Sequence, residues 1–123
     1  MAYRKYSKYK ACKIIIDDIV FDSGLEAARY KQLKVLKDAG AIKNLILQPK
    51  FNLMDSFKYD GKTIRAIDYI ADFMYEEDGK RIVEDVKGVR TKDYIIKSKL
   101  FIKKYILERE YVDEFRELKR GDF

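Results

Sequence analysis

The stretch "YIADFMYEEDGKRIVEDVKG" at residues 69–88 decides the fold. Two short apolar-rich runs flank Asp78-Gly79, and an Asp-Gly pair in this setting is the strongest short-range signal for a β-hairpin. With these two residues as the loop, Asp72 lies directly opposite Asp85. Like charges placed opposite each other destabilise a sheet, so the pair needs a physical reason.

The alternation of strand side chains divides this hairpin into two faces. One face carries Asp72, Asp85 and Lys87. The other is expected to face the core and also carries Glu84, which lies beside Phe73; its apolar members are Ala71, Phe73, Tyr75, Ile82 and Val86.

Two carboxylates with Cβ atoms about 4.5–5.5 Å apart can share a divalent cation. Mg²⁺ prefers oxygen ligands and commonly takes one or two carboxylates together with waters and phosphate oxygens. Lys87 would then hold or activate a water, or stabilise developing negative charge. Three structural alternatives stay open: pairing of the aspartates with Lys87 or Arg81, protonation of one aspartate on burial, and a turn longer by one residue.

Composition limits the possible chemistry. The 123 residues suit one domain, and 47% hydrophobic with 39% charged residues is typical of neither a disordered chain nor a membrane protein. We expect no membrane span, no secretory signal and, with Cys12 as the single cysteine, a reducing cytosolic setting. The absence of histidine removes imidazole bases and His-ligated zinc, so an enzyme of this composition would rely on carboxylates, lysine, arginine, tyrosine or an oxygen-ligated metal.

Positive charge is segregated along the chain, which has a net charge of +6. Basic residues dominate residues 1–13 and 87–104, a pattern typical of polyanion binders, although a solvated basic surface is the alternative. The candidate DNA contacts are Arg4, Lys5, Lys8 and Lys10 in a basic N-terminal arm (1–12), Gln48, and Arg90, Lys92, Lys97 and Lys99 around a second helix.

The chain pattern predicts an α/β fold with a central mixed β-sheet flanked by helices. A hairpin over 13–23, turning at Asp17-Asp18, leads into a helix that Ser23 caps and Gly40 ends. A strand pair or bent strand, broken at Pro49, is expected over 41–54, and a long strand over 62–75 after a second Asp-Gly turn. The remaining elements are expected to be a strand over 81–87, a helix over 91–106 and a last strand over 111–118. All belong to one domain, 13–123. The apolar face of the second helix is expected to be Ile95, Ile96, Leu100, Phe101 and Ile102.

The segments "IADF" (70–73) and "VEDVKG" (83–88) resemble the PD-(D/E)xK nuclease superfamily. Together with "FDSGLEAARY" (21–30), "LQPKF" (47–51) and "KTIRAIDYIADFMY" (62–75), they resemble a small, mostly bacteriophage-encoded branch of predicted endonucleases. The resemblance implies a restriction-endonuclease-like core of order αβββαβ. It also implies Asp72 and Asp85 as metal ligands, Lys87 as the catalytic lysine, the Val86 main-chain carbonyl as a further ligand, and Glu26 as the helix glutamate. Ala71 stands where the superfamily signature has proline, which leaves the carboxylate in place.

The function expected on these grounds is a Mg²⁺-dependent endodeoxyribonuclease, with Mn²⁺ able to substitute. It would act as a homodimer in phage DNA recombination, repair or processing in the cytoplasm of the bacterial host. Resolution of Holliday junctions or other branched DNA and a different nuclease role both stay open. A non-catalytic nucleic-acid-binding module is the alternative. Glu26 also occupies the third helical position of a capping box, so its role as ligand or cap stays open, as does the number of metals.

Overall fold

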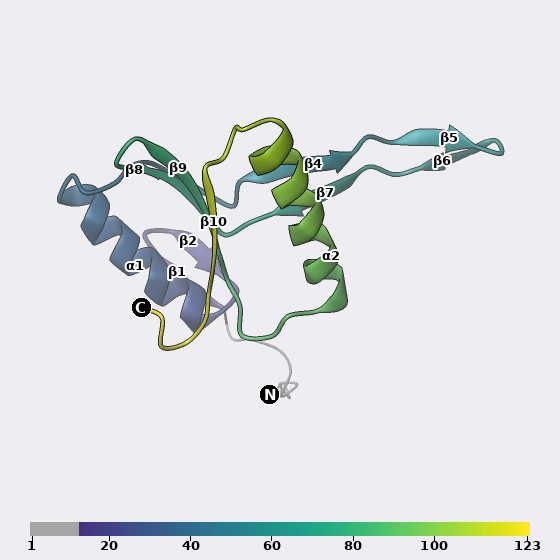
Figure 1. The fold of residues 1–123 in the computed structure, drawn as a ribbon. Coiled ribbons are helices and arrows are strands. Elements are labelled where there is room, and N and C mark those ends of the chain that lie inside the picture. The colour runs from purple at the N-terminus through teal and green to yellow at the C-terminus, as the bar shows by residue number, and fades with distance from the viewer. Residues whose placement is uncertain (1–12) are drawn as a thin grey trace, which may run out of the picture.

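A computed structural model describes residues 13–123 and shows an α/β fold (Figure 1). Its centre is a four-stranded mixed sheet of order β10-β9-β8-β3, in which β10 runs parallel to β9 and the other neighbours are antiparallel. The strands are β3 (Lys43–Leu47), β8 (Phe73–Glu77), β9 (Lys80–Val86) and β10 (Glu114–Leu118). With α1 before β3 and α2 between β9 and β10, the predicted order αβββαβ is confirmed for this sheet and its two helices.

The β8–β9 hairpin forms in the predicted register. Its loop residues Asp78 and Gly79 both have positive φ, 53° and 78°, as a tight type I′ turn requires. Phe73 pairs with Glu84, and the ladder continues to Glu77 with Lys80. Asp72 lies one residue beyond the last pair, and its N–H donates to the Glu84 carbonyl at 3.2 Å.

Both faces of this hairpin are buried. On one side, α1 (Gly24–Asp38) and the small β1–β2 hairpin (Ile14–Ile16, Ile19–Phe21) cover Phe73, Tyr75, Ile82 and Val86. On the other side, α2 (Lys92–Phe101) and the π-helix η1 (Ile102–Glu108) cover a second core that includes Met74, Val83 and Ala71. The expectation of a single core face was therefore wrong, and so was the assignment of Ala71 to the face of Phe73.

Helix α1 begins and ends as the sequence predicts. The Ser23 Oγ accepts a hydrogen bond from the Glu26 N–H at 3.1 Å, and Gly40 follows the helix with φ 80°. Ala27, Tyr30 and Leu33 form its buried face. The β1–β2 hairpin turns at Asp17-Asp18, again with positive φ at both residues.

Two neighbouring strands bend at the same level. Gln48 and Pro49 separate β3 from β4 (Lys50–Met54), while Ala71 and Asp72 separate β7 (Ile67–Ile70) from β8. The bends are joined by hydrogen bonds from the Gln48 N–H to the Asp72 carbonyl, 2.9 Å, and from the Ala71 N–H to the Pro49 carbonyl, 3.0 Å. The β4–β7 pair thus leaves the sheet and continues into a second pair, β5 (Phe57–Tyr59) and β6 (Lys62–Ile64). The long strand expected over 62–75 is in fact three short strands.

The second helix differs from its expected pattern. Tyr94, Ser98, Phe101 and Tyr105 are buried, whereas Ile96 and Leu100 are 59% and 45% exposed. The buried residues recur at helical spacing through a serine, and apolar side chains to either side obscured this stripe in the sequence. Within residues 13–123, no helix combines the length and apolar character needed to cross a membrane.

Candidate active site

Asp72 is positioned by the bend between β7 and β8. Its Oδ2 accepts a hydrogen bond from the Val86 N–H at 2.7 Å, which ties the carboxylate to the end of β9. Its main-chain N–H and carbonyl bond to Glu84 and Gln48. These contacts hold the Asp72 side chain beside the last residues of β9, where Asp85 and Lys87 lie.

Asp85 is almost completely buried, with 1% of its surface exposed. Its Oδ2 accepts a hydrogen bond from the Tyr69 hydroxyl. Its Oδ1 accepts no hydrogen bond, although the Lys87 Nζ forms an ion pair with it at 3.1 Å. We regard this contact as a charge interaction with unfavourable hydrogen-bond direction, so one oxygen of a buried carboxylate lacks a directional partner.

Lys87 is held between a carboxylate and an aromatic ring. Its Nζ lies 4.3 Å from the centre of the Tyr94 ring, a cation–π contact, in addition to the ion pair with Asp85. Its main-chain N–H donates to the Leu118 carbonyl at 2.8 Å, so β10 fixes the backbone at this point. The side chain keeps 28% of its surface exposed and can therefore meet a molecule from solution.

The pKa values of the two aspartates are raised first by burial and second by the charge of a neighbouring carboxylate. Burial and, second to it, the negative charge of Glu26 together raise the pKa of Asp72 to about 7, although the hydrogen bond from Val86 opposes the change. Burial also raises the pKa of Asp85 to about 7, helped by the charge of Asp72 and opposed by the Tyr69 bond and Lys87. The charge of Glu26 therefore acts on the pKa of Asp72, and the charge of Asp72 acts on that of Asp85, in a part of the protein with little access to water.

Glu84, the neighbour of Asp85, has a separate partner on the opposite face. Its oxygens accept hydrogen bonds from Arg29 Nε at 2.8 Å and Nη2 at 2.6 Å, and from the Tyr75 hydroxyl. Side-chain alternation along β9 thus sends Glu84 toward α1 and Asp85 toward Asp72 and Lys87. The sequence-based choice of Asp85 over Glu84 as the partner of Asp72 agrees with this geometry.

Glu26 joins the site from the first turn of α1. Its N–H is the group that Ser23 caps, and the negative charge of its carboxylate raises the pKa of Asp72. The residue therefore occupies a capping position and also faces the aspartates. The sequence leaves these two roles open, and the structure shows that one residue can occupy both places.

The donor set suits a hard cation, although its side chains are not closed around one. Among residues 13–123, no three histidine, cysteine or acidic side chains are arranged as a ready-made metal centre. Asp85 Oδ1, which accepts no hydrogen bond, the adjacent Asp72 carboxylate and the carbonyl of Val86 are nevertheless the kind of oxygen donor that Mg²⁺ accepts. These residues fit a site that a cation and its waters would complete.

The predicted DNA-binding residues do not lie together. Lys97 lines a pocket of about 280 Å³ together with Lys87, Tyr69 and Thr91, and its Nζ pairs with Asp93 at 3.5 Å. The main-chain N–H of Gln48 bonds to Asp72, while Arg90 is engaged with Glu117 at 3.1 Å. Lys92 and Lys99 are exposed, and Arg4, Lys5, Lys8 and Lys10 lie outside the described residues.

Sequence reasoning missed the two tyrosines that position the charged groups. Tyr69 is the hydrogen-bond donor to Asp85, and Tyr94 lies under Lys87 and donates to Glu117 at 2.7 Å. Burial raises the pKa of both hydroxyls, and the charge of Asp85 adds to this, so they remain protonated donors. The chain has ten tyrosines, and only the bend that directs β7 toward β9 distinguishes Tyr69 from the others.

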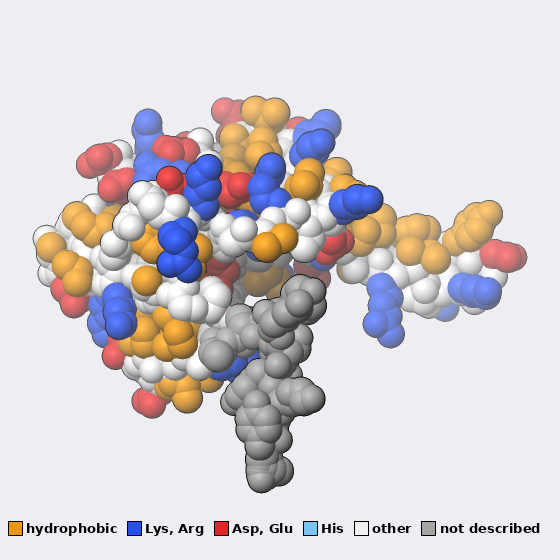
Figure 2. Space-filling model, turned by 90° about the horizontal axis from the view of Figure 1, so that it is seen from below, with side chains coloured by type: hydrophobic (Ala, Val, Ile, Leu, Met, Phe, Trp, Pro, Cys, Tyr) orange, Lys and Arg blue, Asp and Glu red, His pale blue; other side chains and the backbone are white. Residues whose placement is uncertain are grey.

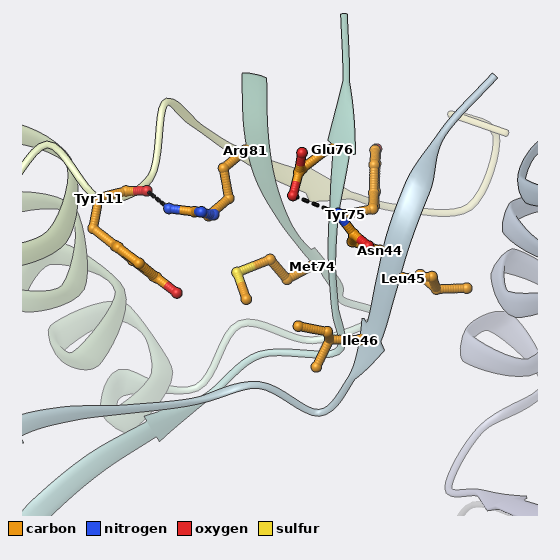
Figure 3. A pocket seen from close by; sticks show the side chains of 8 residues that line it. All are labelled: Asn44, Leu45, Ile46, Met74, Tyr75, Glu76, Arg81 and Tyr111. Atoms are coloured by element: carbon orange, nitrogen blue, oxygen red, sulfur yellow. Dashed lines mark hydrogen bonds between the residues drawn. The ribbon is translucent and has the colours of Figure 1, made fainter. Parts of the chain in front are cut away.

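A larger concavity of about 460 Å³ lies elsewhere on the sheet (Figure 3). Met74 and Ile46 form its apolar part. Arg81 donates to the Tyr111 carbonyl at 2.6 Å and lies 4.1 Å from the Tyr111 ring centre. Here the one carboxylate, Glu76, accepts a hydrogen bond from Asn44 at 2.7 Å. The concavity therefore lacks the paired acids that mark the first site.

Comparison with known proteins places the chain in a family. No curated protein matches the sequence. The sequence profile of the family described as "Protein of unknown function (DUF1064)" matches residues 6–120. This range includes Glu26, Asp72, Asp85 and Lys87, so all four belong to the matched part. The chain is a member of the DUF1064 family.

Proposed function

We propose that the protein is a Mg²⁺-dependent endodeoxyribonuclease with a restriction-endonuclease-like core. The observation that carries the proposal is the pairing of the half-buried Asp72 with the buried Asp85, with Lys87 Nζ 3.1 Å from Asp85 and one Asp85 oxygen lacking a hydrogen bond. A non-catalytic DNA-binding surface has no need of acidic groups kept at this desolvation cost beside phosphates. The resemblance of "IADF" and "VEDVKG" to PD-(D/E)xK nucleases supports the same assignment.

In this proposal, each residue has a defined part. Asp72, Asp85 and the Val86 carbonyl would hold the cation, with Glu26 supporting Asp72. A bound Mg²⁺ supplies Lewis acidity, which lowers the pKa of a water and polarises a phosphoryl group. Lys87 stabilises the added negative charge as the water oxygen bonds to phosphorus and the bond to one sugar oxygen breaks. Tyr69 and Tyr94 keep Asp85 and Lys87 in position.

The proposal is tested by plasmid nicking with and without Mg²⁺, using Asp72→Asn, Asp85→Asn and Lys87→Ala. We expect the aspartate variants to lose cleavage but retain or tighten DNA binding, because each removes a negative charge beside phosphate. Lys87→Ala should lose turnover while Mg²⁺ or Mn²⁺ still raises the melting temperature. That metal-dependent rise should be absent from both aspartate variants.

Glu76→Gln is the matched control, since it neutralises a carboxylate on the same hairpin away from the pair. We expect it to cleave like the wild type. Retention of full cleavage by both aspartate variants would contradict the assignment of the site. Intact DNA binding without cleavage of supercoiled, linear or branched DNA by the wild type would favour the non-catalytic module.

A further inference from the structure

The β4–β7 pair carries a projection that contributes to neither core. The β5–β6 ribbon, which we define as residues 55–66, extends away from the sheet and both helices (Figure 1). All its residues are exposed, and none belongs to either buried cluster. Within residues 13–123, its side chains make no hydrogen bond or ion pair with the rest of the protein. A two-stranded ribbon that packs on no other element is marginally stable in water, so a bound partner would stabilise it.

The two faces of the ribbon have different chemistry. Phe57 pairs with Ile64 and Tyr59 pairs with Lys62, which places these four side chains on one face. Lys58 and Thr63 form the next pair and lie on the opposite face. Figure 2 shows apolar side chains along one side of the projection and basic side chains along the other. Phe57 and Tyr59 are 46% and 71% exposed, which is unusual for aromatic residues without a partner.

This mixture favours nucleic acid over a second protein surface. Lysine is depleted from protein–protein interfaces, yet the ribbon has a lysine on each face. Basic residues interleaved with aromatic ones, as in Phe57-Lys58-Tyr59, suit a phosphate backbone and stacking or wedging against bases. A two-stranded ribbon also matches the width of a DNA major groove, about 12 Å.

The position of the ribbon relative to the carboxylates suits a DNA duplex. Asp60 at the tip and Asp72 are joined by β6, β7 and the bend, and lie 12 residues apart in the chain. At about 3.3 Å per residue, this chain reaches at most about 40 Å. Duplex DNA rises about 3.4 Å per base pair, so the reach corresponds to roughly one helical turn.

We propose that the β5–β6 ribbon is a second DNA-binding element, which enters a duplex groove within about one helical turn of the Asp72–Asp85 pair. The inference rests on the proposed function only in taking DNA as the substrate. Lys58, Lys62 and Arg65 contact phosphates, while Phe57, Tyr59 and Ile64 face the groove. The ribbon thus contributes binding and orientation, while the carboxylate site carries the chemistry.

The test measures DNA binding by fluorescence anisotropy in EDTA, with the full chain and duplexes of about 8 and about 24 base pairs, below and well above one helical turn. The wild type should bind the longer duplex more tightly. For Lys58→Glu with Lys62→Glu, we expect at least about 10-fold weaker binding to the longer duplex. The log–log salt slope should fall by up to about 1.8, because each phosphate contact contributes roughly 0.9. Phe57→Ser with Tyr59→Ser should weaken binding with little change in this slope.

Matched controls lie on the exposed surface of α1. Lys31→Glu with Lys37→Glu makes the same charge change as the ribbon lysine variant. Val35→Ser removes an exposed apolar side chain outside the ribbon. Unfolding curves should agree between the ribbon variants and wild type, since the ribbon packs on neither core. The inference is overturned if ribbon and control variants bind both duplexes equally. It is also overturned if the Phe57 and Tyr59 changes alter the sedimenting mass while DNA binding is unchanged, which would make the ribbon a contact between copies.

The outcomes separate this inference from the proposed function. Loss of binding in the ribbon variants, with no cleavage by wild type in Mg²⁺, would support the ribbon and contradict the nuclease. Cleavage that requires Asp72 and Asp85, with unchanged binding in the ribbon variants, would support the nuclease and contradict the role of the ribbon.

Discussion

At the scale of single residues, two neighbouring acidic residues of β9 have different hydrogen-bonding environments. Glu84 is fully buried but neutralised by two hydrogen bonds from Arg29. Asp85 is equally buried, yet only one of its oxygens accepts a hydrogen bond. The first arrangement is typical of a structural ion pair, whereas in the second a single ion pair with Lys87 leaves one carboxylate oxygen without a hydrogen bond. Alternation along one strand is sufficient to produce both.

We expect Arg29→Met to destabilise the protein by about 3–5 kcal/mol, because it leaves the Glu84 charge buried without its cation. The Arg29 side chain is itself 13% exposed, so solvent does little to screen the loss. The double variant Arg29→Met, Glu84→Leu should recover much of this stability, since it removes both charges. Urea unfolding of the two variants provides the comparison. A double variant no more stable than the single one would show that packing, rather than charge, dominates at this place.

The raised pKa values of Asp72 and Asp85 predict how stability depends on pH without metal. A folded-state pKa of about 7, above the usual 3.8, means that the folded protein holds these protons more strongly than the unfolded chain. Their contribution to stability is therefore fully present below about pH 4 and is lost as the pH rises through about 7.

This effect can be isolated by comparing wild type with Asp72→Asn in EDTA. The melting temperature of the wild type should fall more steeply between pH 5 and pH 8 than that of the variant. The variant removes one titrating group and also the charge that raises the pKa of Asp85. Parallel pH profiles for the two proteins would contradict the proposed protonation.

At the scale of elements, the start of α1 links helix stability to the site. Ser23→Ala removes the oxygen that accepts the Glu26 N–H, and loss of such a cap costs about 1 kcal/mol. We expect a lower urea midpoint and, since Glu26 lies in the same turn, weaker Mg²⁺ stabilisation. Ser56→Ala in the exposed ribbon provides the control and should change neither quantity. Equal effects of the two substitutions would argue against a role of the cap.

The elements also show which features a sequence can predict. The β8–β9 register was predictable because Asp78-Gly79 fixes the turn and therefore every pair beyond it. The direction of Ala71 was not, because the bend at Ala71 and Asp72 depends on hydrogen bonds to Gln48 and Pro49 from a distant strand.

The buried face of the second helix and the roles of Tyr69 and Tyr94 could not be predicted for a related reason. Its buried stripe runs through Ser98, which a hydrophobic pattern does not reveal. Tyr69 and Tyr94 acquire their roles only when β7 and α2 pack over β9. The charged members of the candidate site could thus be found along the chain, whereas the groups that position them required the tertiary structure.

At the scale of the whole molecule, one carboxylate pair can cut one strand at a time. Resolving a four-way junction needs two paired cuts, and a two-fold homodimer is the simplest way to provide them. We therefore expect a dimer that prefers four-way junctions to linear duplex of equal length. Sedimentation gives the mass, and competition between the two substrates gives the preference. A monomer on DNA with equal rates on both substrates would exclude junction resolution and leave the nuclease chemistry standing.

Burial of the β8–β9 hairpin on both faces has a consequence for motion. Backbone amides exchange with solvent only when their surroundings open, and segments enclosed by packed side chains open least often. Exchange should therefore be slowest at Met74 and Val83, and it should approach the rate of an unfolded peptide in the ribbon. Asp72 and Asp85 are thus attached to the slowest-opening part of the chain, while the ribbon can readjust on a much faster timescale.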